Sequence, residues 1–343
     1  MSWAFFSCVR SPALRVRCSI LGLVLFGSAP TLLQFSSRPL LFKQSEKLCV
    51  NGTLLQHVDI DLTRSVFCSS RYAAYILIGD STVRNKYDFA TDQPVGRKHK
   101  GNAHCQRMPC DSTICYVKVE LVSQTAVQRA VSKLPTHVIS SPWKIIVVNF
   151  GLHQLHFYPL RPKFLKSTYN FTSELDSVLS WLLAFSPAGT TGTDSAVNST
   201  NATGTGITKV FAKLTNSICT SLYNDIFATT LENWYIQPAV RGACQQKCIV
   251  SKLQIEAQEC TEYCNRFFFD DFGVHELNTR TMTVLSKFPE IRVLDDYTLT
   301  HGQCECSRMG DGRHYHALIP LWWAKFIDVL SQDLMTSRLP DVE

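Results

Sequence analysis

The sequence predicts an α/β fold, in which helices cover a central parallel β-sheet. Three apolar runs rich in β-branched residues, at 72–78, 144–149 and 291–294, are typical of buried strands. Each run ends in polar residues or glycine, and stretches with helical periodicity lie between and after them. In α/β proteins with this alternation, the loops at the carboxyl ends of the strands form the ligand crevice.

The loops after these three strands are therefore where chemistry is expected. Ser81 comes soon after the first strand, Gly151 after the second and Asp296 after the third. Because the carboxyl ends of parallel strands share one edge of a sheet, we expect these residues to lie near one another.

Helices are expected at 123–134, 172–185 and 317–334, and the last of these has the clearest three- and four-residue apolar spacing. Trp322 and Trp323 lie in this last helix. We assign both to the hydrophobic core rather than to a sugar-binding platform.

A targeting signal precedes the predicted domain. Residues 1–18 carry three arginines and no acidic residue, and an apolar run follows within 19–35. The run is shorter than the roughly 20 apolar residues that comfortably span a bilayer, so a cleaved signal peptide and a retained signal anchor both fit. The basic flank places 1–18 in the cytosol. Residues 36–65 then form a polar lumenal stem, and 66–335 form the folded domain.

Glycosylation motifs and cysteines indicate the same secretory route. All but Cys8 and Cys18 of the 14 cysteines follow the apolar run, which leaves an even number, as a closed disulfide set requires. An oxidising lumen permits both disulfides and asparagine glycosylation. The Asn-x-Ser/Thr motifs stand at Asn51, Asn170, Asn198 and Asn201.

Two segments interrupt the predicted domain. Residues 186–208 are rich in Gly, Ser and Thr and indicate a flexible glycosylated insertion, with a linker between two domains as the alternative. Residues 240–268 contain two pairs of cysteines spaced four apart, which predict a helical hairpin clamped by disulfides. A zinc site is the alternative, but an oxidising lumen favours disulfides. A Cys-x-Cys pair near residue 305 is expected to pin the loop after it. The cysteines concerned are Cys244, Cys248, Cys260, Cys264, Cys304 and Cys306.

The formal net charge of +6 is spread along the chain without a block of Lys or Arg. This pattern gives little support to nucleic-acid binding and only mildly favours acidic partners.

Two short polar motifs predict a nucleophile and its base. Ser81 directly follows a strand and Asp80, where a helix start exposes a serine beside backbone N–H groups that can stabilise an oxyanion. Asp311 precedes His314 by three residues, a spacing that lets the carboxylate orient the imidazole while the ring removes the serine proton. Each motif alone is also typical of an ordinary turn. His316 is an alternative base.

Together these motifs resemble the SGNH (GDSL-like) hydrolase superfamily, and within it the PC-esterase branch. That branch includes the trichome-birefringence-like polysaccharide O-acetyltransferases and the capsule-type and sialate O-acetyltransferases. The resemblance extends from about residue 70 to about residue 330, although only three short blocks are specific. These blocks are Gly79-Asp80-Ser81 with Arg84-Asn85, Val147-Val148-Asn149-Phe150-Gly151-Leu152-His153, and Asp311-Gly312-Arg313-His314-Tyr315.

The resemblance implies a three-layer, flavodoxin-like fold with Ser81, Asp311 and His314 as the catalytic set. It also implies that glycine and asparagine residues supply oxyanion donors beside the serine N–H. The usual Gly-x-Asn-Asp order of the hydrolases is absent, which leaves the donors open. The candidates are Gly79, Asn149 and Gly151, with Gly96 or Gly101 for a separate glycine block.

Three further side chains are candidates for the crevice. Arg84 either holds the nucleophile loop through Asp80, which we favour, or binds an acidic group of the substrate. His153 and His156 could reach the crevice, although a histidine beside a strand end is more often structural or solvated.

The implied reaction is acyl transfer through Ser81, without a metal or bound cofactor and with an acetyl ester or thioester as co-substrate. A sugar hydroxyl as acceptor makes the protein an O-acetyltransferase, which we favour, and water makes it an esterase of carbohydrate or lipid. A catalytically inactive glycan- or protein-binding module and a purely structural cysteine-rich protein are the other hypotheses. The setting implied is a Golgi membrane with the domain facing the lumen, or else secretion or the cell surface.

Overall fold

The computed structural model of the chain describes residues 49–50, 53–54, 67, 73–95, 99, 101–155, 170–185, 207–219, 222, 271–307 and 312–336. Within these residues, no helix is both long enough and apolar enough to cross a membrane. Several sequence predictions lie outside the described residues. They are the segments 1–18, 19–35 and 240–268 with Cys244, Cys248, Cys260 and Cys264, and also Asn51, Gly96, His156, Asn198, Asn201 and Asp311.

Two adjacent parallel strands form the centre of the main sheet, and both were predicted. They are β3, Ala73–Gly79, and β6, Trp143–Val148. Every residue of β3 is buried, because its side chains alternate between two hydrophobic cores, one on each face of the sheet. Ile76 packs into one core and Leu77 into the other.

The main sheet has six strands in the order β4-β5-β3-β6-β7-β8. β4 pairs antiparallel with β5, and every other neighbouring pair is parallel. The chain leaves β3 toward one edge and β6 toward the other, so the strand order reverses between them. Ligands of open α/β sheets bind at such a switch point. The strands not yet bounded are β4, Ala103–Arg107, β5, Thr113–Lys118, β7, Ile207–Lys213, and β8, Arg292–Leu294.

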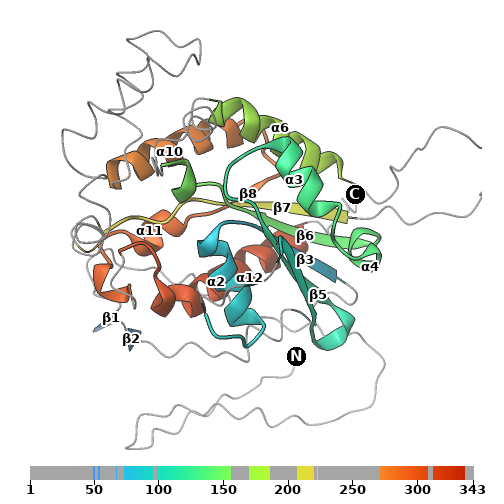
Figure 1. Ribbon diagram of the computed structural model, residues 1–343, viewed down its shortest axis with the longest axis horizontal. Helices are drawn as coiled ribbons and strands as arrows, with labels where there is room; N and C mark the ends of the chain where they lie inside the picture. Colours follow the sequence, from blue (N-terminus) through green and yellow to red (C-terminus); the bar gives the residue numbers. More distant parts are fainter. Residues whose placement is uncertain are drawn as a thin grey trace, which may run out of the picture. The chain divides into compact units, whose positions relative to one another are not determined.

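Helices cover both faces of the sheet (Figure 1). On one face lie α2, Ser81–Ala90, and α12, Ile319–Thr336, whose buried side chains belong to the same core. The other core holds side chains of the helices on the opposite face. These are α3, Gln124–Val131, α4, Thr136–Ile139, α6, Phe171–Ala184, and α10, Asp271–Leu285. The predicted α/β class is confirmed, with helices on both sides of a mostly parallel sheet.

Short elements complete the described chain. A small antiparallel ladder joins β1 and β2, and it lies within the predicted stem. Their bounds and those of the remaining short helices are β1, Cys49–Val50, β2, Thr53–Leu54, η1, Pro109–Asp111, η2, Leu152–Gln154, α11, Asp296–Thr300, η3, Cys304–Cys306, and η4, His316–Leu318.

The three predicted helices correspond to α3, α6 and α12, within a few residues at each end. One boundary was wrong: β7 begins at Ile207, inside the segment 186–208 that was assigned to an insertion. Asn170, the described glycosylation motif, stands directly before α6. Trp322 and Trp323 are buried in the core, as predicted.

Disulfides join distant parts of the described chain. Cys306 is bonded to Cys49 of β1, and Cys304 to Cys219 in the segment after β7. Each cysteine of the Cys-x-Cys pair thus makes one bridge, and the two bridges hold the 301–307 segment, which precedes the loop that the pair was predicted to pin. A third bridge joins Cys105 of β4 to Cys115 of β5.

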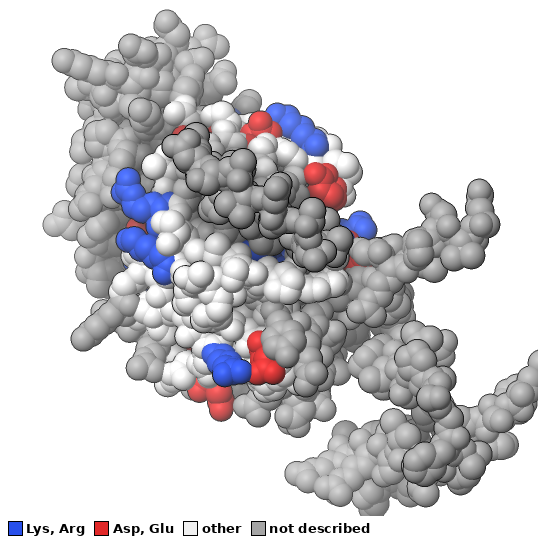
Figure 2. Space-filling view, turned by 90° about the vertical axis from the view of Figure 1, so that its right-hand side faces the viewer, with Lys and Arg blue, Asp and Glu red and all other residues white. Residues whose placement is uncertain are grey.

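The face of the molecule in Figure 2 carries charged side chains of both signs in small, separated groups. Uncharged residues cover most of what is described on this face. The described residues of this face form no continuous basic strip of the kind that a phosphate backbone requires.

Candidate functional site

Ser81 is the first residue of α2, directly after the carboxyl end of β3. Asp80 caps this helix, since its carboxylate accepts hydrogen bonds from the backbone N–H of Thr82 at 2.8 Å and from the Thr82 hydroxyl at 2.7 Å. The cap fixes the turn between strand and helix. Ser81 is therefore held at a helix N-terminus, where backbone N–H groups are available to a developing negative charge.

The Ser81 hydroxyl and the His314 ring are hydrogen-bonded, with 2.8 Å between Oγ and Nε2. These residues are 233 positions apart, and the fold brings them together at the predicted edge of the sheet. A serine bonded to an imidazole nitrogen has the geometry that general-base activation of a nucleophile requires. Asp311 lies outside the described residues, so its predicted orienting role stays a prediction.

The loop that carries His314 is anchored to the segment after β7. Asn216 donates through Nδ2 to the carbonyl of Arg313 at 2.6 Å, and the N–H of Cys219 donates to the carbonyl of Gly312 at 2.7 Å. The bridge between Cys219 and Cys304 adds a covalent link. Backbone contacts on both residues before His314 thus set the position of its imidazole.

His316, the alternative base, points elsewhere. Its Nε2 lies 2.9 Å from Nδ2 of Asn85, and an amide N–H donates to an imidazole nitrogen in this arrangement. The described bonds therefore pair Ser81 with His314 and Asn85 with His316. The rings of the two histidines lie side by side, with 5.9 Å between centroids.

Gly79 and Gly151 occupy places where no side chain fits. A Cβ atom at Gly79 would approach the carbonyl oxygen of Asn149 and the side chain of Val83 to 2.7 Å each. One at Gly151 would lie 1.7 Å from the Thr215 hydroxyl. Both glycines therefore permit close packing at the carboxyl ends of β3 and β6. Their assignment as oxyanion donors stays a prediction.

The amide of Asn149 contacts two neighbouring elements. Its Nδ2 donates to the carbonyl of Lys213 at 2.8 Å, and its Oδ1 accepts from the Thr82 hydroxyl at 3.3 Å. Asn149 is almost fully buried, with 2% of its surface exposed. These bonds tie β6 to β7 and to α2. Gly101 lies at the same edge, just before β4, with a φ of +87° and open space around it.

Arg84 does not hold the nucleophile loop through Asp80 by a side-chain contact. Its guanidinium Nε lies 4.0 Å from the carboxylate of Asp88, one helical turn further along α2. The described side-chain contact of Arg84 is thus with Asp88 rather than with Asp80.

His153 lies near the nucleophile turn and responds to its charge. Burial lowers the pKa of His153 below its ordinary value, and the negative charge of Asp80 offsets only part of that effect. Burial alone would raise the pKa of Asp80. This effect of burial is outweighed by the charge of His153, the hydrogen bonds from Thr82 and the charge of Lys213. The pKa of Asp80 therefore lies below its usual range. Asp80 is therefore an ionised cap.

A buried ion cluster underlies the site and was not predicted. The Asp296 carboxylate lies 2.7 Å from Nζ of Lys213 and 3.4 Å from Nζ of Lys86. All three residues are at most 7% exposed. Burial lowers the pKa of Lys86 to about 8, although the charge of Asp296 opposes this shift. The cluster joins α2, β7 and α11 beneath Ser81.

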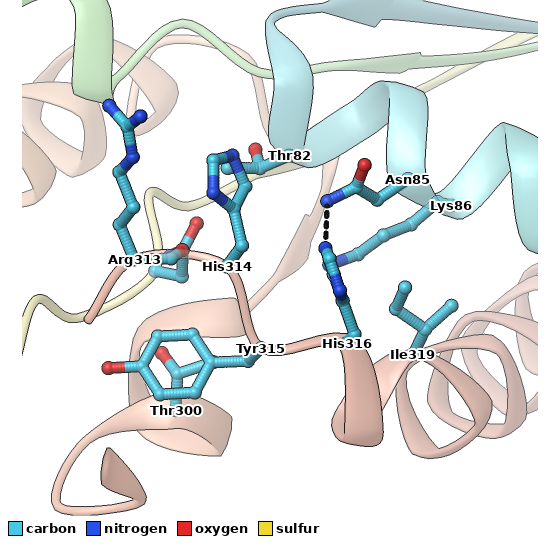
Figure 3. A pocket seen from close by; sticks show the side chains of 10 residues that line it. Thr82, Asn85, Lys86, Thr300, Arg313, His314, Tyr315, His316 and Ile319 are labelled. Atoms are coloured by element: carbon cyan, nitrogen blue, oxygen red, sulfur yellow. Dashed lines mark hydrogen bonds between the residues drawn. The ribbon is translucent and has the colours of Figure 1, made fainter. Parts of the chain in front are cut away.

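A pocket opens beside the Ser81–His314 pair, with about 230 Å³ of empty space between and in front of its walls, part of which is open solvent. Figure 3 shows its walls, with Asn85 and Lys86 reaching in from α2 toward the loop that carries His314 and His316. The side chain of Arg313 runs away from Lys86 and His316. The lining residues are Thr82, Asn85, Lys86, Asn216, Thr300, Arg313, His314, Tyr315, His316 and Ile319.

The sequence contained weak signals for the residues that were missed. Asn85 stood in the quoted nucleophile block without a role, and Asp296 was named as the start of a loop at the expected active edge but without an ion-pair partner. Lys213 and Asn216 belong to a strand and loop that were not predicted. Within the described residues, no group of three or more His, Cys, Asp or Glu side chains is placed to hold a metal ion.

Comparison with known proteins leaves the family open. No protein-family model matches the chain, and no curated protein matches it.

Proposed function

We propose that this protein is a serine-dependent acyl-ester enzyme that transfers an acyl group, most simply acetyl, to a carbohydrate hydroxyl. The observation that carries the proposal is the hydrogen bond of 2.8 Å between Ser81 Oγ and His314 Nε2 at the start of a helix. In this chemistry Asp311 would orient the imidazole, as the family resemblance implies.

The proposed reaction has two balanced steps. Ser81 Oγ attacks the carbonyl carbon of the donor ester while its proton passes to His314 Nε2. Collapse of the tetrahedral intermediate breaks the bond to the donor alcohol, which leaves with the proton from His314. The acceptor hydroxyl then attacks the acyl carbon and gives its proton to His314, and Ser81 leaves and takes that proton back.

The fold and setting support the same proposal. The parallel strands follow the order 2-1-3-4-5 when numbered along the chain, which is the flavodoxin-like order, with Ser81 and Gly151 on either side of the switch point. This order supports the SGNH-type fold. The cysteine-rich, glycosylation-competent chain supports action in the secretory lumen, and we propose a Golgi glycan as the acceptor.

Donor turnover by the purified full chain tests the proposal. With p-nitrophenyl acetate as donor, Ser81→Ala and His314→Ala should each lower the rate at least about a hundredfold, because general-base catalysis contributes at least that much. The double variant should be no slower than the slower single variant, since groups that act as a unit are not additive. His137→Ala, which alters an exposed histidine of α4, is the matched histidine control. Equal rates in wild type and Ser81→Ala would reject the proposal in favour of a binding module.

A further inference from the structure

We propose that the pocket beside His314 recognises a neutral hydroxyl-bearing edge of the acceptor, with Asn85 and Asn216 as the residues that determine specificity. The inference rests on the proposed function, because it concerns the group that attacks the acyl-enzyme. Both asparagines line the pocket together with His314. A hydroxyl bound there would lie next to the base that removes its proton.

Two asparagines that line the pocket each have a buried amide oxygen without a hydrogen-bond partner among the described residues. They are Oδ1 of Asn85 and Oδ1 of Asn216, and each asparagine is 3% exposed. A buried acceptor that is left unpaired destabilises the unliganded protein, so a ligand group that donates to it strengthens binding. Both oxygens therefore favour a ligand that carries O–H or N–H donors.

The orientation of Asn216 follows from its neighbours. Its Nδ2 donates to the carbonyl oxygens of Arg313 at 2.6 Å and of Ser217 at 3.4 Å. Turning the amide over would place Oδ1 against these two acceptors, which is repulsive. Oδ1 of Asn216 is thus held as an acceptor.

Lys86 supplies the complementary donor. Its ammonium has three N–H groups, and its described hydrogen bond to Asp296 is long, at 3.4 Å. That carboxylate lies closer to Lys213, at 2.7 Å. The Lys86 side chain lines the pocket, so it can donate to a ligand oxygen. Two acceptors and one donor around one small space match the hydroxyl group, which both donates and accepts.

Other ligand classes fit less well. A carboxylate or sulfate would place negative oxygens against the two amide oxygens, which only accept. An acyl chain would meet one aliphatic side chain, that of Ile319, among the residues that line the pocket. The free space between the lining residues is about that of one water molecule, so the pocket takes a single hydroxyl group of the acceptor rather than an oligosaccharide.

Acceptor competition tests the inference. The full chain is supplied with p-nitrophenyl acetate and either methyl glucoside or methyl glucuronide, which share a ring and differ in charge, and the acetylated glycoside is quantified. Wild type should prefer methyl glucoside. Asn85→Leu and Asn216→Leu should raise the KM for methyl glucoside about tenfold, the equivalent of one lost hydrogen bond, and lower the ratio of transfer to hydrolysis. The exposed Asn102, changed to Leu, is the matched control.

The outcomes separate the two proposals. A preference for methyl glucuronide would overturn the inference. It would also be overturned if either Leu variant lost transfer and hydrolysis in equal proportion, because an equal loss indicates a purely structural role of the asparagine. If no acceptor is acetylated, binding of methyl glucoside to Ser81→Ala is measured by ligand-observed NMR. If methyl glucoside binds and the added change Asn85→Leu abolishes its binding, the pocket assignment is supported although the proposed function has failed. If methyl glucoside does not bind, the pocket assignment is overturned.

Discussion

Gly151 shows how single residues shape the edge of the sheet that carries Ser81. It stands directly before η2, and its Cα faces Thr215 in the segment after β7 so closely that no β-carbon can be accommodated. Asn216, which holds the His314 loop, is the next residue after Thr215. A disturbance at Gly151 would therefore be transmitted to the proposed base.

Gly151→Ala should destabilise the protein by about 1 to 3 kcal/mol, the usual range for forced overpacking, and should also reduce donor turnover. The added methyl carbon would lie 2.6 Å from Cβ of Thr215 and still closer to its hydroxyl. Urea unfolding at constant pH measures the loss. Adding the second change Thr215→Gly should restore part of both stability and turnover. If Gly151→Ala left stability and turnover unchanged, the close approach of Gly151 to Thr215 would be unimportant.

The buried Lys86 makes the stability of the protein depend on pH in the alkaline range. Its pKa is about 8 in the folded protein against an ordinary 10.5, so the unfolded chain binds more protons between these values. Stability contributed by Lys86 must then rise as pH increases across that window. Relative to Lys86→Met, wild type should gain free energy of unfolding from pH 7.5 to pH 10. The exposed Lys133, changed to Met, is the matched control, and a flat or falling difference for Lys86 would contradict the assigned shift.

The predicted and the missed site residues differ in how they are encoded. Ser81 and His314 lie in short local motifs after a strand and before a helix, so position along the chain was enough to suggest them. Asn216 and Lys213 act through contacts with residues far away in the sequence. Their roles depend on how β7 and the His314 loop are arranged in space, and no local pattern contains that information.

The helix that begins with Ser81 is held to its neighbours by charge as well as by packing. Lys86 of α2 reaches Asp296 of α11, and the indole of Trp323 in α12 donates to the Lys86 carbonyl at 3.1 Å. Asp296 in turn accepts from Lys213 of β7. This arrangement makes the carboxylate of Asp296 the central charge of the cluster.

Asp296→Asn should be strongly destabilising, by about 3 to 5 kcal/mol, because it leaves two buried ammonium groups without their counter-ion. The free energy of urea unfolding at pH 7 checks this value. Glu290→Gln removes an exposed carboxylate and should change the free energy of unfolding little. A loss below about 1 kcal/mol for Asp296→Asn would show that the lysines do not depend on this carboxylate.

Elements with uniform apolar patterns were predictable, and irregular ones were not. β3 and β6 are continuous apolar runs because helices cover both of their faces. β4 reads Ala-His-Cys-Gln-Arg and is only half-buried, so its polar side chains concealed it. β7 ends in a buried lysine, Lys213, whose counter-ion among the described residues is Asp296. A sequence pattern cannot show that such a charge will find its partner inside the fold.

Across the whole molecule, disulfides anchor the segment that precedes the proposed base, which lies far from the nucleophile in the sequence. Ser81 belongs to the first third of the chain and His314 to its end, and the segment 301–307 before His314 is bridged to both Cys49 and Cys219. The hairpin bridge between Cys105 and Cys115 spans only 10 positions, whereas Cys219–Cys304 spans 85.

Replacing Cys219 and Cys304 by Ala should cost about 2 to 4 kcal/mol and lower donor turnover, because the longer closed loop restricts the unfolded chain more and the bridge supports the His314 loop. The matched control is the double replacement of Cys105 and Cys115, which should cost less and affect turnover less. Thermal unfolding and p-nitrophenyl acetate kinetics on both variants provide the comparison. Equal turnover losses would show that the Cys219–Cys304 bridge does not position His314.

Covalent trapping of the acyl-enzyme tests the central claim most directly. The full chain is mixed with an excess of p-nitrophenyl acetate or with a fluorophosphonate, quenched, digested and analysed by mass spectrometry. The label should be found on the peptide that contains Ser81, should form at least about a hundredfold more slowly in His314→Ala, and should persist in Ser123→Ala, which alters a serine at the cap of α3. Labelling that is absent from Ser81 in wild type, or unchanged in rate by His314→Ala, would contradict the account.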